Sequence, residues 1–318
     1  MTEYFFRRLW LLPLNFILVT ILVFVLIRLM PGDVLLVKAG EGLFAGQRDL
    51  EELRRQMGFD KPIYLQYGEF IWGVVRGDFG RSFWTDRAVS DMIIERMPVT
   101  FELAFLAISV AVTIAIPVGV ISAIRQDSIL DYLLRGVAIA GISIPGFWLA
   151  TLVITFPAIW WGFLPPLRFT PLLSDPVRNI SQFVLPALVL GTLLSTTTMR
   201  MTRSMMLEVL RQDYVRTAQS KGLSERVIIV RHALKNALLP VWTVLGLRVA
   251  FLIGGTVIIE SIFALPGMGT LLLDAIKTRD WPVIQGINIF FTVWVLLVNL
   301  IVDVGYGWID PRIRFTKD

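Results

Sequence analysis

Few residues of this 318-residue chain are of the types that carry out chemistry. It has no cysteine and a single histidine, His232, so we expect no disulfide, thiolate site or imidazole cluster. The motifs GxxxxGK[ST], HExxH and GxSxG are absent, which argues against an ATP site, a zinc hydrolase and a serine hydrolase on this chain. We therefore predict a chain with no catalytic residue, metal ion or cofactor of its own.

The remaining candidates are polar side chains inside long apolar runs. Arg248 lies within VWTVLGLRVAFLIGG, where an unpaired cation in a membrane costs at least ~2.5 kcal/mol. It can face a translocation path and a substrate carboxylate, or it can pair with another embedded group or a partner subunit; we favour the pairing. Ser195, Thr196, Thr197 and Thr198 can line a hydrated path, but such hydroxyls also bond to the backbone of their own helix.

Other residues of these runs have structural interpretations. Glu260 and Asp303 stand near the ends of apolar runs, where we expect them at the membrane interface. Gly254 and Gly255 are small enough to let helices pack closely. His232 is expected at the surface.

The elements that position these residues are apolar helices. The chain is 55% hydrophobic and only 17% charged, which is typical of a membrane protein. Runs long enough to cross roughly 30 Å of hydrocarbon lie at 9–29, 99–124, 133–156, 183–202, 237–260 and 283–304. We predict an all-α polytopic membrane protein with six transmembrane helices. The sequence shows no internal repeat. Pro117, Pro145, Pro186 and Pro240 are expected to kink or end these helices.

The distribution of basic residues predicts the orientation. Loops on the cytoplasmic side carry an excess of Lys and Arg. One set of connections holds Arg7, Arg8, Arg125, Arg135, Arg200, Arg203, Arg211, Arg216, Lys221, Arg226, Arg231, Lys235, Arg312, Arg314 and Lys317. The opposite short loops hold only Arg168, Arg178, Lys277 and Arg279. Both termini are therefore predicted to be cytoplasmic, and the net charge of +5 needs no nucleic-acid partner.

These assignments divide the chain into four parts. Residues 1–30 form a retained signal-anchor span, and residues 31–98 form an extracytoplasmic helical segment. Residues 99–304 form a core of five spans that includes the basic hairpin, our name for residues 208–236, and residues 305–318 form a cytoplasmic tail. Within the extracytoplasmic segment we predict a helix near 48–57 that stops at Gly58 and a second near 63–76 that follows Pro62.

The basic hairpin has the local signals of an ordered structure. Residues 209–221 can form a helix that continues the fourth span and ends at Gly222 in the left-handed conformation. Ser224 is placed to cap a second helix, with Glu225 in its first turn. Leu223 and Ile228 have the spacing of a hydrophobic staple across this cap.

Two interpretations of this hairpin remain open on physical grounds. It can be an ordinary basic loop that contacts anionic lipid head groups. It can also be a rigid docking element for a cytoplasmic partner, with Tyr214, Val215 and Ala218 exposed beside basic residues.

A resemblance favours the second interpretation. The stretch DYVRTAQSKGL followed by HALKNALLP resembles the coupling loop of ABC-importer permeases of the dipeptide/oligopeptide/nickel family. The general form of that loop, called EAA, places Glu-Ala-Ala where this chain has Arg216, Thr217 and Ala218, so only the last alanine matches. RLMPGD, GDFGRS, MPVTFELA, SIPGF, FALPGMGTLLLDAI and DPRIR are similar to family motifs in the same order along nearly the whole chain. RLMPGD and the long external segment resemble the oligopeptide-permease B type.

The resemblance implies a type I ABC importer permease fold and a non-catalytic subunit of an ATP-driven peptide importer in a prokaryotic inner membrane. Its partners would be a second homologous permease, two cytoplasmic ATPases that bind ATP and Mg²⁺, an extracytoplasmic substrate-binding protein and membrane lipid. The resemblance assigns the ATPase contact to a run of residues in the hairpin. They are Asp213, Tyr214, Arg216, Thr217, Ala218, Ser220, Lys221, Gly222 and Leu223.

Other cargo and other mechanisms stay open. The same machinery can import nickel chelates, glutathione, oligosaccharides or opines. A stand-alone secondary transporter would be expected to show inverted repeats, which the sequence does not contain. A membrane-embedded enzyme is disfavoured by the missing motifs.

Overall fold

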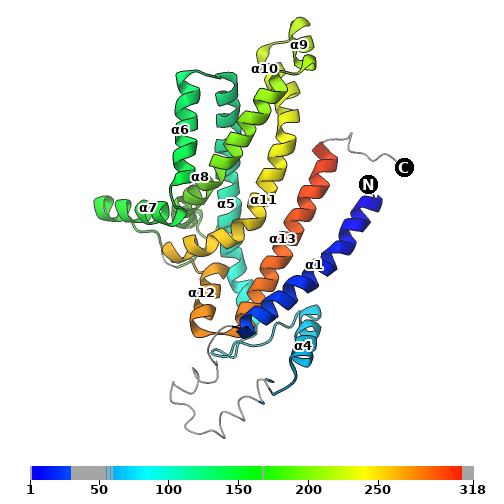
Figure 1. Cartoon of the computed structure of the whole chain (residues 1–318). Helices are drawn as coiled ribbons and strands as arrows, with labels where there is room; N and C mark the ends of the chain where they lie inside the picture. The colour runs from blue at the N-terminus through cyan, green and yellow to red at the C-terminus, as the bar shows by residue number, and fades with distance from the viewer. Residues whose placement is uncertain (1, 30–54, 56–57, 59, 167, 310–318) are drawn as a thin grey trace. The chain divides into compact units, whose positions relative to one another are not determined.

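A computed structural model describes residues 2–29, 55, 58, 60–166 and 168–309, with side chains described for residues 13–305 of these ranges. The described residues are almost entirely helical, and their one strand-like pairing is an isolated bridge between Arg81 and Ala88. The helices, shown in Figure 1, are α1 (Thr2–Leu29), α4 (Ile63–Val75), α5 (Val89–Ile124), α6 (Ile129–Ser143), α7 (Gly146–Trp161), α8 (Pro176–Leu210), α9 (Asp213–Ser220), α10 (Glu225–Val227), the π-helix η2 (Ile228–Ala233), α11 (Leu234–Ile262), α12 (Met268–Thr278) and α13 (Trp281–Ile309).

Four of these helical stretches are long and apolar enough to cross a membrane: Val89–Ile124, Pro176–Leu210, Glu225–Ile262 and Trp281–Gly305. They contain the spans predicted at 99–124, 183–202, 237–260 and 283–304. The span predicted at 9–29 lies inside α1, of which Pro13–Leu29 forms a shorter apolar helix. The described residues thus contain four spans, or up to five with α6 and α7 counted together.

The span predicted over 133–156 is broken into α6 and α7 at Pro145, which was expected to kink or end its helix. α6 and α7 meet at an angle of 99°. Pro145 has no backbone N–H, and a residue before proline avoids the helical region, so Ile144 takes an extended conformation (φ −83°, ψ 123°). Pro117, Pro186 and Pro240 lie inside helices that continue past them.

The chain forms two compact units. The first comprises Met1–Arg8, Pro98–Thr270 and Trp294–Asp318, and the second comprises Leu9–Met97 and Leu271–Val293. In the first unit α8 packs against α6, α7 and α11, and a buried cluster that includes Leu103, Phe183 and Leu252 joins α5, α8 and α11. A Cβ on Gly119 of α5 would lie only 2.8 Å from the carbonyl oxygen of Met199 in α8, so these two backbones touch.

In the second unit α4 packs on α1. The ring of Tyr67 meets the ring of Phe24 edge-on at 5.2 Å, and its hydroxyl lies 3.0 Å from the Thr20 hydroxyl. The helix predicted near 63–76 is confirmed as α4. The helix predicted near 48–57 lies outside the described residues except for Arg55, although Gly58 does adopt a left-handed φ of +70°.

Candidate functional site

The basic hairpin consists of two short helices joined by a glycine turn. α9 ends at Ser220, and Gly222 has the predicted left-handed φ of +75°. The prediction that α9 continues the fourth span is wrong, because α8 ends at Leu210 and Gln212 is extended (ψ 148°) before α9 starts. Ser224 precedes α10 as predicted, but its side chain makes no capping hydrogen bond.

Buried apolar side chains hold the two arms of the hairpin together. Val215 and Ala218 of α9 are 0% and 7% exposed and pack against Ile228 of η2 and Leu210 of α8. The prediction that Val215 and Ala218 are exposed is therefore wrong. Because Ile228 is buried by these residues while Leu223 stays 41% exposed, the predicted staple is replaced by packing between α9 and η2.

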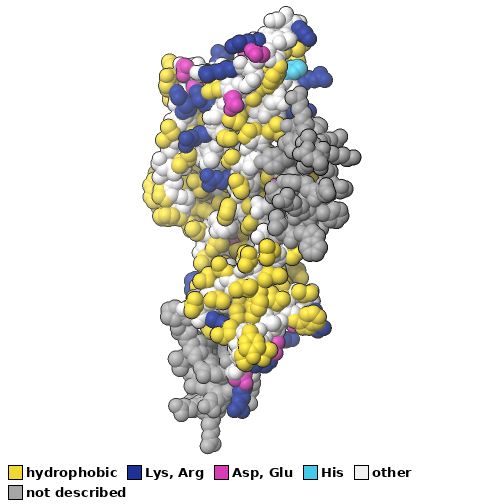
Figure 2. Space-filling view, turned by 45° about the vertical axis from the view of Figure 1, so that its right-hand side comes forward, with side chains coloured by type: hydrophobic (Ala, Val, Ile, Leu, Met, Phe, Trp, Pro, Cys, Tyr) yellow, Lys and Arg dark blue, Asp and Glu magenta, His cyan; other side chains and the backbone are white. Residues whose placement is uncertain are grey.

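The outer face of the hairpin is polar and accessible. Figure 2 shows Lys and Arg side chains gathered over this end of the first unit. The exposed residues among those assigned by resemblance are Asp213, Tyr214, Arg216, Thr217, Ser220, Lys221, Gly222 and Leu223. Tyr214 is 42% exposed, and its hydroxyl accepts a hydrogen bond from the Asn236 amide at 2.9 Å. Eight of the nine assigned residues are thus exposed, and Ala218 is buried.

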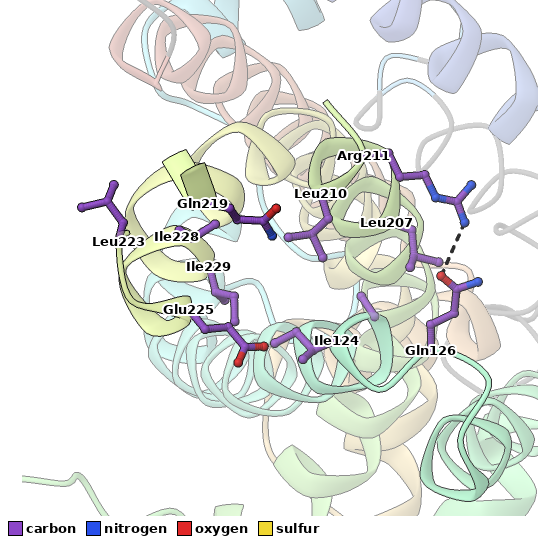
Figure 3. Close-up of a pocket in the computed structure, with 11 residues that line it drawn as sticks. Ile124, Gln126, Leu207, Leu210, Arg211, Gln219, Leu223, Glu225, Ile228 and Ile229 are labelled. Atoms are coloured by element: carbon purple, nitrogen blue, oxygen red, sulfur yellow. Dashed lines mark hydrogen bonds between the residues drawn. The ribbon is translucent and has the colours of Figure 1, made fainter. Parts of the chain in front are cut away.

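A pocket of about 520 Å³ separates the hairpin from the end of α5 (Figure 3). Its apolar lining includes Ile124 of α5, Leu207 of α8 and Ile229 of η2. Gln126 and Arg211 lie at its border, where the Arg211 guanidinium donates to the Gln126 side-chain oxygen at 3.4 Å. The hairpin is joined to α8 and α11, and Ala233 of η2 also shares a buried apolar cluster with Ala123 near the end of α5, so the cavity covers only part of this contact.

The π-helix is a feature that the sequence did not reveal. The six residues Ile228–Ala233 of η2 have the wider π-helical turn within the otherwise continuous helical stretch Glu225–Ile262. Such segments often occur at functional sites. Apolar spacing predicts a helix here but cannot distinguish a π-turn from an α-turn.

Arg248 is exposed on α11 and lines a second pocket of about 340 Å³. Its guanidinium donates to the Thr197 hydroxyl at 3.4 Å. Thr197 is thus an embedded polar group that Arg248 meets, while no carboxylate of the described residues lies within ion-pair distance of Arg248.

Of the predicted hydroxyl residues, only Thr197 bonds to Arg248, and Ser195, Thr196 and Thr198 do not line its pocket. Ser195 is 5% exposed and donates to the backbone oxygen of Thr192, and Thr196 donates to that of Leu193, both at 2.8 Å. Thr198 is fully buried and bonds to Leu194 in the same way. These three hydroxyls therefore donate to backbone oxygens of their own helix, as the alternative interpretation predicts.

Gly254 and Gly255 do not mediate close packing inside the chain. A Cβ on either would meet no atom within 4 Å, and both are exposed on α11 beside Phe251 and Ile258. Among the described residues no helix packs closely against these two glycines, and close packing against another chain stays a prediction.

Glu260, which we expect at the membrane interface, is fully buried inside the protein. Its carboxylate accepts from the Thr100 hydroxyl at 2.7 Å and from the backbone N–H groups of Gly269 and Thr270 at 2.7 and 3.1 Å. It thereby satisfies the free N–H groups at the start of α12, which a helix cannot satisfy itself.

Sequence comparison identifies the family. The family described as "Binding-protein-dependent transport system inner membrane component" matches residues 115–315, and its N-terminal companion matches residues 1–104. The chain belongs to this family. Membership makes it a membrane component of a transport system, in agreement with the apolar helices.

Relatives with known names agree with this family. The dipeptide transport system permease protein DppB of Escherichia coli (strain K12) is 38% identical over 340 residues, and the di/tripeptide transport system permease protein DppB of Pseudomonas aeruginosa (strain UCBPP-PA14) is 40% identical over 337 residues. Each match covers 100% of both chains.

Two solved structures show the same fold at low identity. An inward-facing MetNI methionine ABC transporter has a TM-score of 0.57 at 16% identity, covering 69% of this chain and 96% of that chain. An amino acid ABC transporter has a TM-score of 0.51 at 13% identity, covering 69% and 94%. The likeness concerns the helical fold alone, which this family member shares with chains of ABC transporters.

Proposed function

We propose that this chain is the permease subunit of an ATP-driven importer of di- or oligopeptides. The observation that carries the proposal is the similarity, over the whole chain, to permeases named for dipeptide and di/tripeptide transport. In this proposal the chain has six spans with both termini in the cytoplasm, and residues 31–98 lie outside the membrane on the opposite side.

The hairpin is the proposed contact for the ATPase subunits, which bind ATP and Mg²⁺. Three observations support this role: the polar outer face is exposed, the interior is closed by Val215, Ala218 and Ile228, and Gly222 makes the turn. A rigid element can transmit a displacement into the helices to which it is joined, here α8 and α11.

The remaining partners follow from the family. An external binding protein would deliver the substrate, and a second permease would complete the path. The exposed face of α11, which carries Leu247, Phe251, Gly254, Gly255 and Ile258, is our candidate for the contact with that second permease. Arg248, which lines a pocket together with Phe251, Gly255 and Ile258 of this face, would face the path or a group of the partner.

Reconstitution tests the proposal. The chain is purified with the subunits that co-purify with it, inserted into vesicles, and assayed for ATP-dependent uptake of a labelled dipeptide in the presence of its binding protein. Uptake is expected only with ATP and binding protein. Uptake of glutathione or a nickel chelate without dipeptide uptake would contradict the substrate, and uptake by the chain alone with an ion gradient would contradict the importer assignment.

Gly222→Val tests the hairpin. Valine strongly disfavours the left-handed conformation, so the turn should distort and ATPase stimulation by loaded binding protein should fall about tenfold while membrane insertion is retained. Gly136→Val is the matched control, because a Cβ there also meets no atom within 4 Å but Gly136 lies inside α6. Normal stimulation in the Gly222 variant would contradict the proposed contact.

A further inference from the structure

A buried ionic cluster lies close to the hairpin and is not explained by docking. Asp131, in the first turn of α6, is 0% exposed. Its carboxylate accepts two hydrogen bonds from the Arg203 guanidinium of α8, from Nε at 2.8 Å and from Nη2 at 2.7 Å. It also accepts from the Ser122 hydroxyl of α5 at 2.5 Å and from the backbone N–H of Asp127 at 3.1 Å. One side chain thus joins α5, α6 and α8 within the first unit.

The geometry of this cluster resists sliding. A guanidinium that donates two parallel bonds to one carboxylate fixes both distance and orientation. The apolar contacts nearby, such as those of Ala123 and Met206, have no comparable directionality. The side chain of Arg203 is only 16% exposed, so water screens this ion pair less than one at the surface.

The ionic cluster lies close to the point where α8 leads into the hairpin. Arg203 lies seven residues before the end of α8 at Leu210, roughly 10 Å along a helix, and the hairpin follows directly. The pocket of about 520 Å³ lies between the hairpin and the end of α5. A displacement of the hairpin therefore reaches α6 through α8, and it reaches α5 through α8 and through the buried cluster that Ala123 shares with Ala233 of η2.

We propose that Asp131 is a positioning residue that locks α5 and α6 to α8, so that movement of the hairpin displaces the three helices together. This inference rests on the proposed function, in which ATPase subunits move the hairpin. Without the lock, α8 would shift past its neighbours, and ATP hydrolysis would proceed with less transport.

The first experiment measures coupling in the reconstituted complex. Asp131→Asn should lower the amount of dipeptide imported per ATP hydrolysed about tenfold, since coupling free energies commonly correspond to factors of this size. Arg203→Lys, which keeps the charge but loses the paired bonds, should give an intermediate loss. Asp127→Asn is the matched control: the same charge is removed four residues earlier, in the connection between α5 and α6, but Asp127 is exposed and its left-handed φ of +59° suits Asn. Its ratio should stay within twofold of the wild type.

A second measurement separates this inference from the proposed function. Because the chain has no cysteine, labels can be placed at Leu133→Cys on α6 and Glu208→Cys on α8, both exposed. The distance between the labels should stay constant when ATP is added to the complex, and it should change with ATP in the Asp131→Asn background.

The outcomes are distinct. An unchanged import ratio in assembled Asp131→Asn complex, or a variant that only lowers the yield of complex, would overturn the positioning role. A label distance that does not respond to ATP in the variant would overturn it as well. Failure of the wild-type complex to import dipeptide would contradict the substrate, while the label distances would still decide the role of Asp131.

Discussion

Asp131 and Glu260 are two buried carboxylates of the first unit that are stabilised in different ways. Asp131 is balanced by the charge of Arg203, which lies on another helix 72 residues away in the sequence, and by Arg135 of its own helix at 3.6 Å. Glu260 has neutral donors only: one hydroxyl from α5 and two backbone N–H groups nine and ten residues further along the chain. Thr100 and Ser122, their partners on α5, are roughly 33 Å apart along that helix.

The difference indicates two kinds of rigidity. Glu260 completes a local turn between α11 and α12 and anchors it to Thr100, so its removal should chiefly affect folding. Asp131 joins α5 and α6, which are linked by a short connection, to α8. No covalent turn holds α8 in register with these two helices at that point. Its removal should chiefly affect how helices move together.

The largest effect on stability is expected for Glu260→Ala. Three buried donors lose their acceptor, and each unsatisfied group costs about 1–3 kcal/mol, so the free energy of unfolding should fall by about 4 kcal/mol. Equilibrium unfolding in mixed micelles measures this loss. Glu208→Ala, which removes an exposed carboxylate from α8, should leave the unfolding curve unchanged. Equal unfolding curves for Glu260→Ala and the wild type would contradict the claim that Glu260 chiefly stabilises the fold.

Asp131→Asn should have the second-largest effect on stability. It leaves Arg203 mostly buried without its counter-charge, for which a loss of about 3 kcal/mol is expected. The double variant Asp131→Asn/Arg203→Gln should lose less than the sum of the two single variants, because the two groups act as one pair. Additive losses measured by the same unfolding titration would show that the pair does not act as a unit.

Gly267→Ala should have a smaller effect on the same network as Glu260. A Cβ at this position would collide with the Glu260 carboxylate, and relief of such overpacking typically costs about 2 kcal/mol. Gly254→Ala provides the control, since it adds the same methyl group in open space. If both glycine variants unfold like the wild type, the carboxylate can move, and Glu260 is less constrained than its hydrogen bonds indicate.

Local patterns in the sequence predicted much of the fold. The apolar runs at 99–124, 183–202, 237–260 and 283–304 coincide with helices of spanning length, because hydrophobicity over about 20 residues is a property of the sequence alone. Gly222 was recognised as the turn of the hairpin for a similar reason, since few other residues take a left-handed φ at low cost.

The interior of the hairpin was predicted less well. Val215 and Ala218 looked like exposed docking residues because they stand among charged neighbours. Their burial depends on η2, which folds back after the turn and covers them. Their apolar side chains were a signal of this packing. Only the path of the chain after Gly222, which brings η2 back against α9, shows that they lie on the covered face of α9.

The sequence by itself determined that this protein is a helical membrane component with a basic glycine-turned hairpin, since composition, periodicity and backbone preferences act over short stretches. The tertiary structure alone decided the partners of the buried carboxylates. Asp131 looked like an ordinary acidic residue in the first turn of a helix, and Glu260 like an interfacial one. Their partners lie up to 160 residues away, and only the packing of α5, α6, α8 and α11 brings those groups within hydrogen-bonding distance.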